Sequence, residues 1–492
     1  MATETKLLKH TLHYFSGEVL VLAASLISLP VLTRVLTVDE YGQMTLITSF
    51  LAIAVTVSKM GLNHSAVRFY SEYSVAGGKN LSEFYSTLFL TSIVAGVLVA
   101  LLSGIVPRFI PQINWTMDLF NLLAFVAVTI PMRSAGSVFI SFLRAEERTK
   151  FYNIFSVVSR YFALGVSLGF LLYFLKNLYG YYAGLIFTEI ISFAFVLYLV
   201  IKKRKIGVGK ISNTFLRESL KYGLPLFGFE IASSILSYGD RFLVEHYLNS
   251  EMLAYYSVGY NCSSYVADLI VFPLRTAVIP IFINTWISEG EEATKKFLEK
   301  SYGYFMIIFF AIIFGIIGIR EEFITLVASN KYIKAQEVVP YIITGKLIYG
   351  TYIFFAAGLF IFKKTHVLTI SLALACVLNF ALNIFLIPEF GLKGAAVANL
   401  ITYVMLNIMI IMYSFKLIKF KIEYYSILKY GVIGIIMYLI IGRIEFHNKL
   451  VQMLCKIMIG MLVYLTPVII LDNGMREGVM KYLRRYAGKK LK

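Results

Sequence analysis

Apolar runs of about 20 residues recur along the whole of this chain, and each is long enough to cross about 30 Å of hydrocarbon as a helix. Of its 492 residues, 59% are hydrophobic and 15% are charged. A soluble domain carries about 45–50% apolar and about 25% charged residues. A transmembrane barrel would need alternating segments of about ten residues, whereas these runs are continuous. The sequence therefore predicts an all-α polytopic membrane protein.

We predict about fourteen transmembrane helices from these runs. They are expected at residues 14–37, 43–62, 82–106, 117–142, 152–174, 178–201, 220–245, 253–287, 301–319, 338–362, 366–387, 391–415, 427–442 and 451–471. The thirteenth is short, and the eighth is long and contains Pro273 and Pro280, which predict a kink or a break there.

The net charge of +18 is better explained by membrane orientation than by nucleic-acid binding, because the basic residues lie mostly in short loops on one side of the predicted spans. This asymmetry places both termini in the cytoplasm and requires an even number of spans. The segment MATETKLLKH is followed by a full-length span without a small-residue cleavage site, so we expect no cleavable signal.

A polar interruption after the sixth span divides the chain into two similar parts. LTVDEYGQMTL, residues 36–46, aligns without gaps on LNSEMLAYYSV, residues 248–258, and two weaker matches follow at nearly the same offset. An even number of spans separates equivalent positions, which indicates a parallel repeat. We predict a six-helix lobe at 1–201, a basic cytoplasmic linker at 202–219, a second six-helix lobe at 220–418, and two extra helices with a basic cytoplasmic tail at 419–492.

Charged residues inside the spans need an explanation, because each costs about 2.5–3.5 kcal/mol at the bilayer centre on insertion scales. Several recur at helical spacing, as Glu230, Ser234, Ser237 and Arg241 do in the seventh span. One interpretation is that they form structural pairs and that Ser and Asn hold helices together. The other, which we favour for the set, is a polar and slightly basic lumen between the two lobes.

The candidate residues fall into four groups. The bases are Arg34, Lys59, Arg133, Arg160, Arg275 and Lys346; the amides are Asn261, Asn379 and Asn383; the acids are Glu189, Glu230 and Asp268; and Asp240 with Arg241 form an adjacent pair expected near the outer mouth. That pair could equally be an interfacial anchor that ends the span.

Catalytic and metal-binding patterns are missing from the sequence. The string IGVGKIS lacks the first glycine of a phosphate-binding loop, and the six histidines show no metal-ligand spacing. The three cysteines lie inside apolar runs, which argues against a loop disulfide. We therefore expect neither an enzyme nor a cofactor-binding protein.

Three stretches resemble polysaccharide biosynthesis membrane proteins. LPVLTRVLTVDEYGQMTLITSF is similar to their opening R-x-L-x-x-x-E-Y-G signature, the stretch from Lys221 to Asn261 to their seventh and eighth helices with the D-R pair, and FGLKGAAVANLITYV to their twelfth-helix entry. These proteins are the Wzx-type flippases, relatives of lipid II flippases and of multidrug MATE exporters.

The resemblance implies two six-helix lobes, two extra C-terminal helices and alternating access in the bacterial cytoplasmic membrane. The implied substrate is an undecaprenyl-pyrophosphate-linked oligosaccharide, for O-antigen, capsule or a similar polymer, turned from the inner to the outer leaflet. The bases would bind pyrophosphate, Ser, Asn and Tyr would bind sugar, and Glu189, Glu230 or Asp268 could carry H⁺ or Na⁺. Our hypothesis is that the lobes rock about residues 202–210.

Three alternatives remain open. A MATE-like ion-coupled exporter of small molecules shares the plan but favours an acidic lumen. A membrane polymerase or ligase usually carries a large outer loop, and no predicted loop here is that long. A scaffold subunit is opposed only by the charged spans. A polysaccharide polymerase or glycosyltransferases are conceivable partners, but no residue identifies one.

Overall fold

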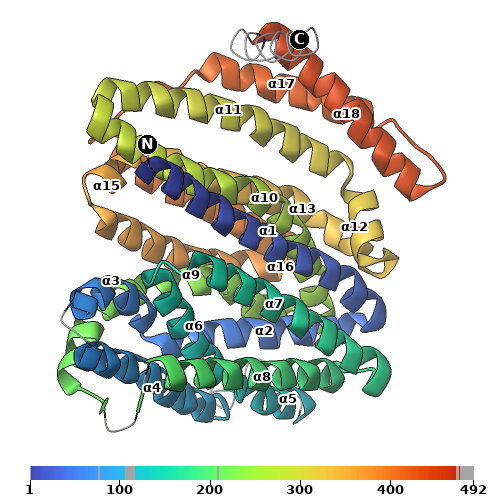
Figure 1. The fold of residues 1–492 in the computed structure, drawn as a ribbon. Helices are drawn as coiled ribbons and strands as arrows, with labels where there is room; N and C mark the ends of the chain where they lie inside the picture. Colours follow the sequence, from blue (N-terminus) through green and yellow to red (C-terminus); the bar gives the residue numbers. More distant parts are fainter. Residues whose placement is uncertain are drawn as a thin grey trace, which may run out of the picture. The chain divides into compact units, whose positions relative to one another are not determined.

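A computed structural model describes residues 2–75, 78–105, 117–204, 206–207, 210–472 and 476, and nearly all of them are helical (Figure 1). Each of the fourteen predicted segments coincides with one helix or with two or three consecutive helices, except that 366–387 and 391–415 share one long helix. The elements are α1 (Ala2–Val35), α2 (Val38–Lys59), α3 (Leu62–Val75), α4 (Gly78–Ser103), α5 (Met117–Ala127), α6 (Thr129–Ala145), α7 (Thr149–Gly169), the π-helical turn η2 (Phe170–Phe174), α8 (Leu178–Arg204), α9 (Asn213–Tyr247), α10 (Ser250–Glu289), α11 (Glu291–Gly318), α12 (Arg320–Ala328), the 3₁₀ segment η4 (Asn330–Glu337), α13 (Val339–Gly350), α14 (Tyr352–Phe355), α15 (Ala357–Ile361), α16 (Thr365–Ser414), α17 (Tyr424–Ile441) and α18 (Lys449–Leu471).

The helices confirm a multi-pass membrane protein. Within the described ranges, 10 helices are long and apolar enough to cross a membrane, or up to 11 if the pair Asn330–Glu337 and Val339–Phe355, bent by 58°, is one span. The long α9 is outside this set and carries Glu230, Asp240 and Arg241 along its length. The count of fourteen crossings stays a prediction.

The two longest helices, α10 and α16, differ in whether their backbone leaves the helical conformation. α10 continues through Pro273 and Pro280 as one helix, so the chain does not break there, and the alternative of a kink stays a prediction. α16 contains Gly391 at φ 56° and ψ −134°, a conformation that glycine adopts without strain. This residue separates the segments predicted as the eleventh and twelfth spans.

The chain forms two compact units. Unit 1 comprises Met1–Ser257 and Thr369–Ala398, and unit 2 comprises Val258–Leu368 and Asn399–Lys492. Their boundaries lie inside α10 and α16 rather than in loops. The division predicted from the sequence repeat, with its lobes at 1–201 and 220–418, stays a prediction.

In unit 1, α2 packs on α9, α4 on α6, α1 on α7 and α7 on α8 (Figure 1). A close backbone approach fixes where α2 ends. Met60 and Gly61 both have positive φ, and a Cβ on Gly61 would lie 2.1 Å from the carbonyl oxygen of Gly223 in α9. This turn holds the end of α2 and the start of α3 directly against α9.

The aligned turns of the sequence repeat have the same construction. Thr37 caps α2, with its hydroxyl accepting from the Glu40 amide and the Glu40 carboxylate accepting from the Thr37 amide. The equivalent Asn249 caps α10, with its side-chain oxygen accepting from the Met252 amide at 2.8 Å. The repeat therefore extends to the capping residue of each turn.

The predicted linker is attached to unit 1. Residues 202–204 complete α8 and 213–219 begin α9, so the non-helical part is short. Along it, the Gly207 amide, the Lys210 ammonium and the Ser212 amide donate to Ser86, Ser82 and Thr87 of α4 at 3.2, 3.1 and 2.9 Å. Rocking of lobes about this segment stays a prediction.

In unit 2, α17 packs on α11 and α18, and α12 packs on η4 and α18. Gly434 of α17 lies where a Cβ would come 2.4 Å from the Phe314 ring of α11. The hydroxyl of Tyr464 donates to the Ile307 carbonyl at 2.8 Å. The two predicted extra helices are thus packed directly on α11.

Candidate functional site: a charged cavity in unit 1

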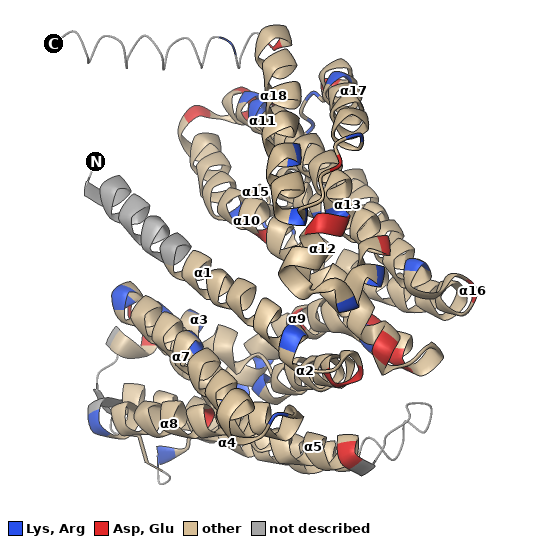
Figure 2. Ribbon diagram, turned by 90° about the vertical axis from the view of Figure 1, so that its right-hand side faces the viewer, with Lys and Arg blue, Asp and Glu red and all other residues tan. Residues whose placement is uncertain are grey.

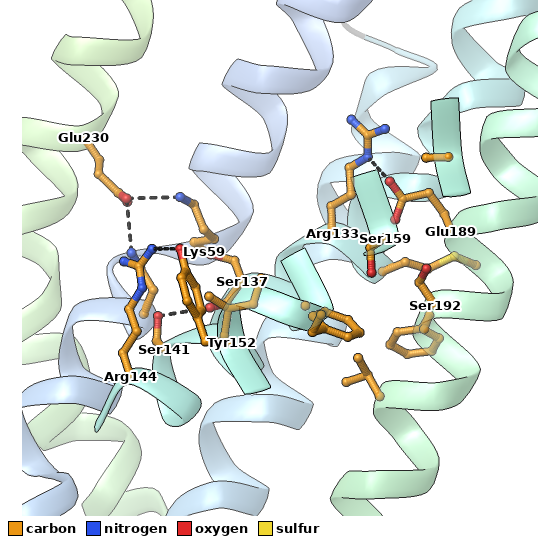
Figure 3. A pocket seen from close by; sticks show the side chains of 18 residues that line it. Lys59, Arg133, Ser137, Ser141, Arg144, Tyr152, Ser159, Glu189, Ser192 and Glu230 are labelled. Carbon is orange, nitrogen blue, oxygen red and sulfur yellow. Dashed lines mark hydrogen bonds and ion pairs between the residues drawn. The ribbon is translucent and has the colours of Figure 1, made fainter. Parts of the chain in front are cut away.

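A cavity of about 480 Å³ opens between helices of unit 1 and has charged and hydroxyl side chains along its walls (Figure 3). It lies among the end of α2, the start of α3, and α6, α7, α8 and α9. Its polar lining residues are Lys59, Asn63, Arg133, Ser137, Ser141, Arg144, Tyr152, Ser159, Glu189, Ser192 and Glu230. Its size is typical of a small-ligand site.

The first charged group of the cavity is centred on Glu230 of α9. Its Oε1 accepts from the Lys59 ammonium at 3.0 Å and from the Asn63 amide at 3.1 Å, and His64 Nε2 lies 3.6 Å from the same oxygen. The turn at Gly61 brings these three residues to α9. Lys59 and Glu230 are 14% and 22% exposed, so the ion pair is largely removed from solvent.

The second charged group joins α6 to α8. Arg133 donates from Nε to a Glu189 oxygen at 2.9 Å, and both side chains are about three-quarters buried. This bond uses only the Nε–H group of the guanidinium, and the structure shows no other hydrogen bond from Arg133 to the described residues. The remaining N–H groups are thus able to bind a ligand oxygen.

Arg144 is a functional candidate that the sequence analysis missed, because it lies just beyond the predicted span 117–142. Its Nη2 donates to the Tyr152 hydroxyl at 2.7 Å, and its guanidinium lies 4.8 Å from that ring. The described residues place no carboxylate within ion-pair distance of it. The signal in the sequence was the stripe Arg133, Ser137, Ser141 and Arg144, which share one face of α6.

The cavity has three bases and two acids, so the bases are in excess by one formal charge. Four serine hydroxyls and Tyr152 add neutral donors and acceptors. Such a set can bind an anionic group through Arg and Lys while hydrogen-bonding sugar hydroxyls beside it.

Two predicted bases of unit 1 lie outside this cavity. Arg160 of α7 donates to the Ser25 hydroxyl of α1 at 2.9 Å, and Arg34 donates to the Pro30 carbonyl of its own helix at 2.8 Å. The cavity is lined by another face of α7, which carries Tyr152, Phe155, Ser159 and Ala163.

Unit 2 brings three other predicted residues together. Lys346 of α13 lies 4.5 Å from the Tyr260 ring and 5.7 Å from the Tyr403 ring. Asp268 of α10 is within electrostatic range of Lys346 and Arg275. Asn261 follows Tyr260 on the same helix, so unit 2 carries a second mixed polar group.

The predicted amides Asn379 and Asn383 are buried in the unit 1 segment of α16. The Asn383 amide donates to the Asn379 backbone and side-chain oxygens at 2.8 and 3.0 Å. They therefore bond to each other one helical turn apart, as helix-stabilising amides do.

The adjacent Asp240 and Arg241 are both buried and bond to different helices. Asp240 accepts from the Tyr256 hydroxyl of α10, and Arg241 donates to the Ser49 hydroxyl of α2 at 3.0 Å. Successive residues on a helix do not face each other, which explains the two separate directions. They connect α9 to α10 and to α2, and their predicted place at an outer mouth stays a prediction.

A comparison of this sequence with known protein families identifies the family of the chain. The family model described as "Polysaccharide biosynthesis protein" matches residues 31–337, more than half of the chain. This chain belongs to that family. The match confirms the resemblance predicted from the sequence motifs.

Two of the relatives are named as a probable flippase and a putative transporter. The chain is 23% identical over 290 residues to "Probable low-salt glycan biosynthesis flippase Agl15" of Haloferax volcanii, covering 57% of this chain and 61% of that protein. It is 26% identical over 282 residues to "Putative O-antigen transporter" of Shigella flexneri, covering 56% and 64%. It thus spans less than two thirds of each of these relatives.

Solved structures show the fold. "Lipid II flippase MurJ, inward closed conformation" aligns with a TM-score of 0.78 and 16% identity, covering 95% of this chain and 99% of that one. An inward-facing multidrug resistance MATE transporter of the MOP superfamily aligns with a TM-score of 0.66 and 12% identity, covering 82% and 95%. The chain therefore has the fold of these transporters.

Proposed function

We propose that this protein is a flippase that moves a lipid-linked oligosaccharide, carried on undecaprenyl pyrophosphate, from the inner to the outer leaflet of a cytoplasmic membrane. Family membership and the named relatives support the class of substrate. The observation that carries the proposal is the unit 1 cavity, where Lys59, Arg133 and Arg144 outnumber two acids in a wall rich in hydroxyl groups.

The chemistry of a pyrophosphate headgroup matches these side chains. Arg can engage phosphate oxygens with two parallel N–H groups, and Lys binds them as a point charge. No carboxylate among the described residues pairs with Arg144, which makes it the first contact for the headgroup in our proposal. Hydroxyls of Ser137, Ser159 and Ser192 would then meet the first sugar.

The acids of the cavity are candidates for coupling to H⁺ or Na⁺. Glu230 and Glu189 each hold one base, so protonation or cation binding at the carboxylate would release Lys59 or Arg133 toward the phosphate. Asp268, which is within electrostatic range of Lys346, is a further candidate in unit 2. Transport could also run without coupling, downhill, because the product is consumed outside.

An ion-coupled exporter of cationic small molecules is the second candidate. The MATE structures share the fold, and the cavity does contain two carboxylates. Both carboxylates already bind bases, however, and the excess of bases would repel a cationic drug. We therefore favour the flippase.

The test is to quantify lipid-linked oligosaccharide in cells depleted of this protein. We expect the complete unit to accumulate, wild type to clear it, and Arg133→Gln or Arg144→Gln to clear it poorly. The control is Arg68→Gln, which removes an exposed α3 guanidinium that pairs with Glu72. An unchanged lipid-linked pool on depletion would reject the flippase and bring the exporter forward.

A further inference from the structure

Unit 2 contains a second polar cavity, of about 470 Å³, that the proposed transport does not use. It lies where the end of α11 and the start of α12 meet the end of α17 and the start of α18; Figure 2 marks acidic residues on α12. Its charged lining residues are Arg320, Glu321, Glu322, Glu445, Lys449 and Lys456. Positive and negative groups are therefore equal in number.

The wall of this cavity contains a buried carboxylate with one oxygen in use. Glu322 is 2% exposed, and its Oε1 accepts from the Lys456 ammonium and from the Gln452 amide, both at 2.5 Å. Its Oε2 is buried without a hydrogen-bond partner among the described residues. A buried acceptor without a donor is costly, so this oxygen is suited to receive an N–H or O–H from a ligand.

The remaining charges indicate the charge of that ligand. Glu321 is paired with Lys449 at 2.7 Å. Within the part of the chain that the structure describes, neither Arg320 nor Glu445 has an ion pair within 4.0 Å; Arg320 donates to the Ile317 carbonyl at 3.5 Å, and Glu445 is within electrostatic range of Lys449. One cation and one anion are therefore left in the same cavity, which fits a ligand that carries one charge of each sign.

The surroundings favour a lipid over a soluble molecule. The cavity lies at the ends of α11, α17 and α18, each of which is long and apolar enough to span a membrane. Phe446 lines it and is exposed, and Leu439 and Leu450, next to the lining residues Tyr438 and Lys449, are exposed too. Acyl chains can lie along these side chains while the headgroup enters the polar cavity.

We propose that this cavity binds a phospholipid with a zwitterionic headgroup that ends in a primary ammonium, of the phosphoethanolamine type. Arg320 binds the phosphate, and Glu322 Oε2 and Glu445 accept N–H groups from the ammonium. A phosphocholine headgroup has no N–H to donate, so the two carboxylates select against it. With the predicted orientation, the bound lipid belongs to the outer leaflet.

The experiment uses the full-length protein, delipidated and then exposed to equal amounts of palmitoyl-oleoyl phosphatidylethanolamine, phosphatidylcholine and phosphatidylglycerol. Native mass spectrometry measures the fraction of protein with each lipid bound. We expect phosphatidylethanolamine to bind about tenfold more tightly than phosphatidylcholine, the equivalent of one charge-assisted hydrogen bond.

Two variants assign the roles. Glu445→Gln, at an exposed position, should reduce the preference for phosphatidylethanolamine, while Glu322 Oε2 retains part of it. Arg320→Gln should weaken both together, and the control Glu291→Gln, on the opposite end of α11, should change neither. Equal binding of the two lipids by wild type, or an unchanged preference in Glu445→Gln, overturns the proposal. Displacement of the lipid by a soluble oligosaccharide also overturns it, in favour of a glycan site.

Discussion

The Lys59–Glu230 pair offers the sharpest test of how this protein holds charge inside its helices. The perturbation is a double-mutant cycle with Lys59→Met, Glu230→Gln and the two together. At 3.0 Å and an effective dielectric constant of about 20, the Coulomb attraction is about 5.5 kcal/mol before any cost is subtracted. Because the pair is 14% and 22% exposed, loss of hydration offsets more than half of that attraction.

We expect a coupling free energy of about 2 kcal/mol between the two sites. This value lies above the 0.2–1 kcal/mol that is typical of exposed pairs and below the roughly 3–5 kcal/mol of a fully buried pair that loses one partner. Lys59→Met alone should be more costly than the double variant, because it leaves the Glu230 carboxylate with only Asn63 and His64.

The assay is reversible unfolding of each variant in mixed detergent micelles. Arg68 and Glu72 of α3 serve as the matched control, because they approach more closely, at 2.6 Å, but are 49% and 51% exposed. Their coupling should be about 0.3–0.5 kcal/mol, as for helix pairs four residues apart. If this surface pair couples as strongly as Lys59 and Glu230, burial does not set the strength of the cavity pairs and our reasoning is refuted.

Two further predictions concern the helix turns. Gly61→Ala should destabilise unit 1 by more than about 2 kcal/mol in the same assay, because its φ is positive and its Cβ would collide with the Gly223 carbonyl. Gly165→Ala, where no atom lies within 4 Å of the added Cβ, should be neutral or stabilising by about 0.5–1 kcal/mol, and equal effects at the two sites would contradict the steric account. Thr37→Ala and Asn249→Ala should each cost about 0.5–2 kcal/mol as lost helix caps, and hydrogen exchange should show faster opening of the first turn of α2 or α10 respectively. Unchanged exchange in both variants would mean that these turns are held by packing alone.

Much of the fold can be predicted from the sequence. Apolar runs long enough to cross the hydrocarbon core must satisfy their own backbone hydrogen bonds, and a helix does this within one segment. The short elements α3 and α12 were not predicted, since Leu62–Val75 and Arg320–Ala328 are too polar or too short to stand out by hydropathy. Of the kink or break predicted at Pro273 and Pro280, the break does not occur, because a helix can lose a backbone hydrogen bond at a proline and still continue.

The candidate site was predictable in part. The sequence analysis identified Lys59, Arg133, Glu189 and Glu230 as charged residues within predicted spans, and the structure brings all four to one cavity. The residue pattern of one helix does not show which neighbouring helix it packs against. Arg160 was therefore grouped with these residues, although it bonds to Ser25 of α1. That grouping depends on how helices rotate about their axes when they pack, which a single sequence does not contain.

Arg144 was missed for a different reason. Positive residues near span ends are read as orientation signals, and the boundary of α6 extends three residues beyond the predicted span. The stripe that begins at Arg133 continues past the end of the predicted span. Following it to the next helical position would have included Arg144.

The most direct test of the central claim is translocation by the purified protein in proteoliposomes. A fluorescently labelled oligosaccharide on undecaprenyl pyrophosphate would be loaded in the inner leaflet, and its arrival outside would be measured with an added glycosidase. We expect wild type and Arg68→Gln to move the lipid, and Arg144→Gln and Arg133→Gln to slow it by about tenfold or more, as loss of a charge-assisted phosphate contact requires. Equal rates for all four proteins, or no movement beyond empty liposomes, would contradict a phosphate-binding flippase cavity in unit 1.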